Sequence, residues 1–318
     1  MISHNASDEW HDAVVTERGI DEDDFREHSA HVWAIAYRVT GSAADADDLV
    51  QETFVRAMSA RRAEELRPWL VRIATNASID VLRARRRTQY IGPWLPEPID
   101  TGDAYGSNTG GARYDLLESV SLAFLIALEA LSPRARAVLL LRDVFDYSVR
   151  QTSTVLTMTE THVKVTHHRA RKVMEAYDAS RRVPTRELQD KTREALVAMM
   201  SALAIGDLSA LEALLAEDAQ TINDSAGDYT AARVPVIGNK KIALFWTKVR
   251  PREVESVEMR MLNGLPAVVA RTKSPDSRLA PCIALTLTLN STGRIATLHG
   301  IVATAKLARL LDGKQSLG

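Results

Sequence analysis

Cysteine is nearly absent from this 318-residue chain, which contains Cys282 alone. A single thiol excludes an internal disulfide and a cysteine-based zinc finger, and it is typical of proteins that stay in a reducing compartment. Apolar runs of membrane-spanning length are also lacking, and the acidic, polar N-terminus does not resemble a signal peptide. We therefore expect a soluble, cytoplasmic protein without a membrane partner.

The chain also lacks a large net charge of either sign, since its formal net charge is only −1. The balance is uneven along the chain. Residues 1–30 hold nine Asp and Glu against two Arg, residues 61–90 hold eight Arg against three Asp and Glu, and residues 131–182 hold ten Lys and Arg against five Asp and Glu. Two basic modules, in a chain long enough for two or three domains, indicate nucleic-acid binding. The acidic residues 1–24 are predicted to be a flexible lead-in.

An acidic amphipathic helix is predicted over residues 45–57. At about 100° per residue, acidic side chains share one side and apolar side chains share the other. The acidic side holds Asp45, Asp48 and Glu52, and the apolar side holds Val50, Phe54 and Ala57. A solvated surface explains such a face equally well by itself, so its meaning depends on the segments that follow.

A second helix, with a basic end, is predicted from Arg67 to Arg83, with Pro68 at a tolerated early position. A basic cluster at a helix end can simply complement the helix dipole. Arginines next to an asparagine on the same polar face are better suited to phosphate and base contacts. The face and the cluster after it comprise Arg72, Asn76, Arg83, Arg85, Arg86 and Arg87.

Residues 89–115 are predicted to be a linker, because three prolines occur within residues 93–98 and glycine and serine follow. An ordinary linker has no apolar anchor. Trp94 and Leu95, which precede Pro96, depart from that pattern. We therefore expect this part of the linker to dock on another domain.

A second helical module is predicted over residues 116–182. It begins with one helix from Leu116 to Leu131 and a second from Arg134 to Asp143, after Ser132–Pro133. A short helix ending at Leu156, a three-residue turn and a basic helix over 160–177 form a helix-turn-helix pattern. Thr161, Lys164, His168 and Arg171 are predicted to project from the last helix.

The remainder, residues 185–318, is predicted to be an α+β domain, because helices precede a run of antiparallel strands. The helices are expected at 186–204, 208–215 and 240–248, and the strands at 254–261, 267–271, 282–289 and 294–303.

Two motifs resemble a known family. Asp45–Phe54 followed by Trp69–Asp80 resembles region two of the extracytoplasmic-function (ECF) sigma factors, and Phe145–Ser148 through Lys172 resembles their region four. The linker from Gly92 to Pro98 and the C-terminal α+β domain resemble the subgroup with a fused SnoaL-like domain, the SigJ type. The resemblance implies region two at 25–88, region four at 116–182 and a SnoaL-like (NTF2-like) cone domain at 185–318.

The resemblance also implies partners and roles. The protein would bind core RNA polymerase, through the clamp helices of the β′ subunit and the β subunit, and promoter DNA. It would have no catalytic activity, cofactor or metal, would be a monomer when free, and would be modulated by its C-terminal domain. The residues that would bind polymerase are Asp45, Asp48, Gln51 and Glu52. The residues that would recognise the minus-ten element are Arg61, Arg62, Arg72, Asn76, Arg83, Arg85, Arg86 and Arg87, and those for the minus-thirty-five element are Thr161, His162, Lys164, His168, Arg169 and Arg171. The linker residues with a regulatory role would be Trp94, Leu95 and Pro96.

Two alternatives stay open from sequence alone. In the first, the C-terminal domain is a cyclase or isomerase, with Asp224, Asp228, Trp246 and His299 supplying polar groups in an apolar pocket. The second is a ligand-sensing repressor that binds DNA through the helix-turn-helix. It leaves the acidic helix and residues 69–87 without a role. One departure from the family pattern concerns the helix-turn-helix, where Thr157 occupies a turn position that is usually glycine and Thr152 a core position that is usually aliphatic.

Overall fold

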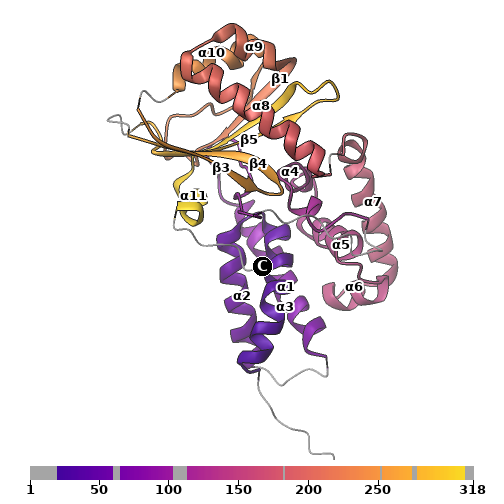
Figure 1. Ribbon diagram of the computed structural model, residues 1–318. Helices are drawn as coiled ribbons and strands as arrows, with labels where there is room; N and C mark the ends of the chain where they lie inside the picture. Colours follow the sequence, from indigo (N-terminus) through magenta and orange to yellow (C-terminus); the bar gives the residue numbers. More distant parts are fainter. Residues whose placement is uncertain are drawn as a thin grey trace, which may run out of the picture.

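The computed structural model describes residues 20–59, 65–102, 113–181, 183–250, 253–273 and 278–311. They form a helical N-terminal half and a C-terminal half in which helices pack on a sheet (Figure 1). None of the helices within these ranges is long and apolar enough to cross a membrane. The first bundle consists of α1 (Glu22–Thr40), α2 (Ala43–Met58) and α3 (Leu66–Arg85).

The start of α1 corrects one expectation. The Asp21 carboxylate accepts hydrogen bonds from the backbone N–H groups of Asp23 and Asp24, and the Asp24 side chain accepts one from the Asp21 N–H. This is a capping box, and acidic side chains stabilise the positive end of a helix. Residues 21–24, which we assigned to a flexible lead-in, are therefore the cap and first turn of α1. Residues 1–19 of that lead-in lie outside the described residues.

The second helical module also differs in one place from the prediction. The single helix expected over 116–131 is wrong, because the Ser121 backbone is not helical, with φ of −59° and ψ of 144°, and its hydroxyl accepts a hydrogen bond from the Phe124 N–H, which starts a new helix. The helix-turn-helix is confirmed. The module consists of the short 3₁₀ helix η1 (Glu118–Val120), α4 (Leu122–Leu128), α5 (Pro133–Asp143), α6 (Val149–Leu156) and α7 (Glu160–Ala179).

The two helical modules share one hydrophobic core. Tyr37 of α1, Leu70 of α3, Leu140 of α5 and Val163 of α7 are all buried in it. At the boundary, the guanidinium of the buried Arg136 in α5 donates a 2.8 Å hydrogen bond to the Val39 carbonyl at the end of α1. Buried polar groups are costly unless they are paired. This arrangement therefore joins the modules as one packed unit.

The C-terminal half is an α+β domain, as predicted. Its helices are α8 (Arg186–Ile205), α9 (Leu208–Leu214), α10 (Asn239–Val249) and α11 (Thr304–Leu311). Its strands are β1 (Leu215–Asp224), β2 (Val236–Ile237), β3 (Val254–Leu262), β4 (Leu265–Thr272), β5 (Cys282–Leu289) and β6 (Ile295–Ile301), in the order β2-β1-β6-β5-β4-β3. All neighbouring pairs are antiparallel except β1 and β6, which are parallel.

The two faces of the sheet have different partners. Helices α8, α9 and α10 cover one face, and α11 and the helical half lie on the other (Figure 1). The second face buries Leu95 of the linker together with Val269 and Leu307. The expected docking of the linker on another domain is therefore confirmed. The linker lies between the sheet and the first bundle.

Candidate functional site

The acidic face of α2 divides into two parts. Asp48, Gln51 and Glu52 are exposed, and Glu52 forms a 2.6 Å ion pair with Arg56 one turn along the helix. Such exposed pairs contribute little to stability. Asp45 differs, because it lies half-buried at 2.7 Å from the Arg85 guanidinium of α3. The part of this face that is open to a partner therefore consists of residues 48, 51 and 52.

A further acidic residue of α2 was missed by the sequence analysis. Asp47 accepts a 2.7 Å hydrogen bond from the Trp33 indole of α1 and forms an ion pair with Arg309 of α11. The last described helix of the C-terminal domain is thus tied to the same helix that presents the exposed acidic face. No sequence signal connects these residues, because 262 positions separate Asp47 from Arg309.

The polar face of α3 contacts the second helical module at one point. Arg72 is exposed, but the Asn76 amide donates hydrogen bonds to the Arg72 carbonyl at 2.8 Å and to the Val155 carbonyl of α6 at 3.1 Å. Val155 belongs to the first helix of the helix-turn-helix. The asparagine that we predicted to contact DNA therefore bridges the two helical modules in this structure.

The arginine cluster at the C-terminal end of α3 is only partly free. Arg83 pairs with Asp80 at 2.9 Å, Arg86 donates to the Leu131 carbonyl at 2.6 Å, and Arg87 is exposed. Arg85 donates to the Thr40 carbonyl at 2.8 Å and lies 4.7 Å from the ring centre of Trp94. Arg61 and Arg62 lie outside the described residues.

The last helix of the helix-turn-helix presents its predicted residues to solvent. Thr159 caps α7 by accepting a hydrogen bond from the His162 N–H. Asp143 of α5 lies 2.8 Å from the His167 ring and 3.7 Å from the Arg171 guanidinium, and so contacts α7 at two positions. The side chains of this face are all exposed: Thr161, His162, Lys164, His168, Arg169 and Arg171. An exposed helix with this basic face has the shape and charge that suit a DNA major groove.

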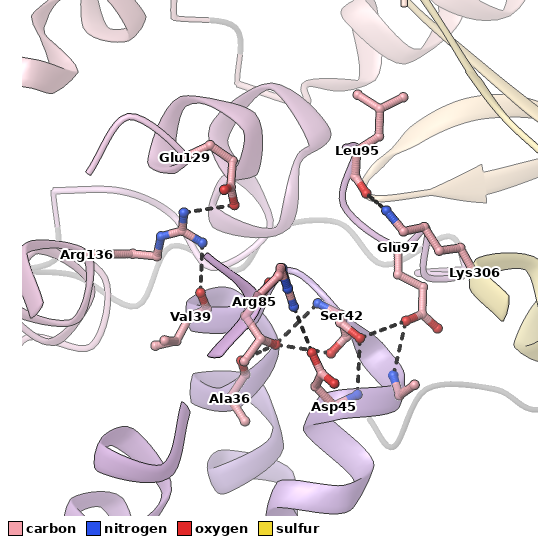
Figure 2. A network of polar contacts seen from close by, with 12 residues as sticks. Ala36, Val39, Ser42, Asp45, Arg85, Leu95, Glu97, Glu129, Arg136 and Lys306 are labelled. Atoms are coloured by element: carbon pink, nitrogen blue, oxygen red, sulfur yellow. Dashed lines mark hydrogen bonds and ion pairs between the residues drawn. The ribbon is translucent and has the colours of Figure 1, made fainter. Parts of the chain in front are cut away.

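The linker is held by the helical bundle on one side. The buried Glu97 carboxylate accepts hydrogen bonds from the Ser42 hydroxyl at 3.2 Å and the Ala44 N–H at 3.1 Å, at the start of α2 (Figure 2). Burial raises the pKa of this carboxyl. Gly41 makes room for the linker, because a side chain there would meet the Trp94 ring at 2.6 Å and because its φ of 69° disfavours other residues.

The C-terminal domain holds the linker on the other side through what we call the linker clasp: Asp224, Lys306, Tyr90 and Leu95. The buried Asp224 carboxylate accepts hydrogen bonds from the Tyr90 hydroxyl at 2.6 Å, the Leu95 N–H at 2.7 Å and the Lys306 ammonium at 2.6 Å. Lys306 also donates to the Leu95 carbonyl (Figure 2). Burial lowers the pKa of Lys306, an effect that the adjacent Asp224 opposes.

Comparison with known proteins identifies the family. The Sigma-70 region 2 family matches residues 25–88, and the Sigma-70, region 4 family matches residues 121–174. The ECF RNA polymerase sigma factor SigJ of Mycobacterium tuberculosis is 33% identical over 218 residues, which cover 68% of this chain and 68% of that protein. The chain belongs to the ECF sigma factors.

The likeness to ECF sigma factors extends into the C-terminal domain. The probable ECF RNA polymerase sigma factor SigI of M. tuberculosis is 27% identical over 291 residues, or 89% of this chain and 93% of that protein. The crystal structure of M. tuberculosis SigJ matches with a TM-score of 0.66 at 25% identity, covering 91% of this chain and 98% of that chain. Sigma factors bind core RNA polymerase and promoter DNA, and they direct transcription initiation rather than catalyse a reaction.

The arrangement of the C-terminal domain also argues against the catalytic alternative. Of the four residues proposed for that site, Trp246 alone lines the cavity between the sheet and its helices. Asp224 binds the linker, Asp228 accepts a hydrogen bond from the Thr304 N–H, and His299 pairs with Thr286 in the sheet. These side chains lie on different sides of the sheet and do not converge on one reacting centre.

Proposed function

We propose that this ECF sigma factor recognises polymerase and promoter through the residues assigned above and that the structure is its closed state. Asp48, Gln51 and Glu52 bind core polymerase. The exposed arginines of α3 and of the segment after it contact the minus-ten element, and α7 reads the minus-thirty-five element. The protein acts in the cytoplasm, where polymerase and chromosome are found.

One observation supports the closed state: the Asn76 hydrogen bond to Val155, within a core that both modules share. Promoter elements centred about 25 base pairs apart are separated by roughly 85 Å of B-form duplex, at about 3.4 Å per base pair. Two modules packed against each other do not reach both elements at once. Promoter recognition therefore requires that α3 and α6 separate.

The C-terminal domain opposes this separation. Its linker clasp fixes residues 90–95, and the linker in turn caps the first bundle through Glu97. Opening the modules pulls on this same segment, because it connects them. In the proposed mechanism, the fused domain therefore sets the free energy of opening and, through it, the affinity for polymerase and promoter.

The test is transcription in vitro with core polymerase and a promoter library randomised at the minus-ten and minus-thirty-five elements. We expect the full chain to initiate from a defined subset of promoters. A chain ending at Pro184, without the C-terminal domain, should initiate from the same subset with higher efficiency, because nothing then opposes the separation of the modules. If neither protein supports promoter-dependent initiation, the assigned function is wrong; if both initiate equally well, the role given to the clasp is wrong.

A further inference from the structure

A cavity of about 850 Å³ lies in the C-terminal domain between the sheet and helices α8 and α10. Its walls are apolar, with Leu203 from α8, Trp246 from α10, and Val268 and Leu285 from the sheet. The volume falls in the usual range for small-molecule sites, about 300–1,000 Å³. The lining residues Ala204 and Val257 are exposed, so the cavity is open to molecules from solvent.

One buried amide side chain is among the described residues that line the cavity. Asn223, only 6% exposed, lines it from the end of β1. Its Nδ2 makes one long contact of 3.5 Å to the Thr221 hydroxyl, and no group in the described part of the chain donates to its Oδ1. A buried amide normally satisfies both of its polar ends. Asn223 therefore keeps hydrogen-bonding capacity for a molecule inside the cavity.

The neighbouring strand leaves room for this amide. At Gly300 of β6, a Cβ atom would lie 2.5 Å from the Asn223 Oδ1 and 3.2 Å from the Trp246 ring. The Trp246 indole N–H is already engaged, since it donates to the Thr221 hydroxyl at 3.2 Å. The glycine thus allows the Asn223 amide to lie against β6 beside the indole.

The charge of the cavity limits the class of ligand. Among the described lining residues Arg250 is the one with a charge, and its guanidinium donates to the Leu203 carbonyl at 2.6 Å and the Ala204 carbonyl at 3.3 Å at the end of α8. A charged ligand would lose its hydration in such an apolar space without gaining a free counter-ion. The walls therefore favour an uncharged, largely apolar molecule.

The cavity adjoins the linker clasp at the end of β1. Asn223 and Asp224 are consecutive in β1, so their side chains point to opposite faces of the sheet. One lines the cavity and the other holds Tyr90, Leu95 and Lys306. Val302, which also lines the cavity, is hydrogen-bonded to the clasp residue Asp224: its N–H donates to the Asp224 carbonyl at 2.8 Å.

We propose that the cavity binds an uncharged apolar molecule with one hydroxyl or carbonyl group, and that its occupancy is coupled to the linker clasp through the end of β1. The polar group of the ligand pairs with Asn223. Because the cavity is formed while the clasp is closed, the ligand stabilises the clasped state. By reciprocity, loosening the clasp weakens ligand binding.

Binding is tested with N-phenyl-1-naphthylamine, an uncharged fluorescent probe with one N–H group that can donate to the Asn223 Oδ1. The full chain is titrated by fluorescence. Ala204→Trp and Val257→Trp place a large ring at two exposed positions of the cavity wall, and each should weaken binding at least about tenfold. Val197→Trp, on an exposed part of α8 outside the cavity, should bind like the parent protein. If both wall variants fold and still bind the probe as the parent does, the site is wrong.

Coupling is tested with substitutions on the opposite face of β1. Asp224→Asn and Tyr90→Phe each weaken the clasp without altering the cavity wall, and each should weaken probe binding about fivefold or more. Asp218→Asn is the matched control, because it makes the same change at an exposed position of β1 that belongs to neither the clasp nor the cavity wall. Unchanged probe affinity in both clasp variants would overturn the coupling. These measurements contain no polymerase or DNA, so their failure is distinguishable from failure of the proposed function.

Discussion

The Asn263 amide donates a 2.7 Å hydrogen bond to the Tyr37 hydroxyl, joining the β3–β4 turn of the C-terminal domain to α1 of the first bundle. The same Nδ2 donates to the Val120 carbonyl of the second module at 2.7 Å, and the Oδ1 accepts from the Ile99 N–H of the linker at 3.2 Å. The Asn263 side chain thus contacts the first bundle, the second helical module and the linker. The closed arrangement therefore depends on a small number of buried hydrogen bonds rather than on a large apolar interface alone.

Asn263→Gly should destabilise the closed chain by about 3 kcal/mol, because it leaves buried groups of the linker and the second module without partners. Glycine keeps the backbone conformation, whose φ is 53°. Asn263→Ala should cost roughly 1 kcal/mol more, since a Cβ atom disfavours that conformation. Denaturant unfolding of both variants measures the two effects separately. Equal stability of the parent and the glycine variant would show that the junction contributes nothing.

Asp48→Arg should lower the affinity for core polymerase at least about tenfold while leaving the unfolding midpoint unchanged, because the exposed side chain contributes little to the fold. Polymerase binding is measured by fluorescence anisotropy of labelled protein. The control is Asp190→Arg, the same charge reversal at an exposed position of α8. A loss of thermal stability in the Asp48 variant would instead assign this face a structural role.

His299→Leu should make the protein less sensitive to acid. Burial lowers the pKa of His299 from 6.5 to about 4, so the folded chain keeps the imidazole neutral while the unfolded chain takes up a proton below pH 6.5. The stability that this group contributes is therefore complete above pH 6.5 and is lost as the pH falls towards 4, by roughly 3 kcal/mol. Unfolding free energies between pH 7 and 4.5 should fall less steeply in the variant. A slope in the variant equal to that of the parent would show that His299 does not contribute to the acid sensitivity.

Thr157→Gly should raise the stability of the helix-turn-helix by about 1 kcal/mol. Thr157 ends α6 in the left-handed region with φ of 52°, which costs a β-branched residue more than glycine. Thermal unfolding measures the gain. Thr154→Gly, inside the same helix and also exposed, should have the opposite sign because glycine lowers helix propensity. A loss of stability at position 157 would show that the threonine makes a favourable contact there.

Amphipathic segments were the predictable part of this fold. The helices around Asp48, Asn76 and Lys164 follow from apolar periodicity, and β5 follows from its run of β-branched and aliphatic residues. β1 was missed because Leu215–Asp224 mixes polar and apolar residues without clean alternation, since the strand contacts the cavity on one face and the linker on the other. α11 was missed because residues 304–311 form only two turns, whose burial depends on the sheet above them.

The site was predictable only as exposed surface. The positions of Thr161, Lys164 and Arg171 on one face follow from helical spacing alone. The roles of Asn76 and Arg85 do not, because their partners Val155 and Trp94 come from other elements. Asp224 illustrates the same limit. Its three partners lie between 82 and 134 residues away in the sequence, so no local pattern indicates that it holds the linker.

Six residues separate the end of α7 from the start of α8, so the fused domain never leaves the vicinity of the helical half. A separate inhibitory protein would release its target on dilution or when its synthesis fell behind. A tethered domain acts at an effective concentration set by the tether, which reaches the millimolar range for short connections. In the proposed mechanism, the balance between closed and open molecules is consequently independent of how much of the protein a cell makes, and every copy would carry its own restraint from the moment it folds.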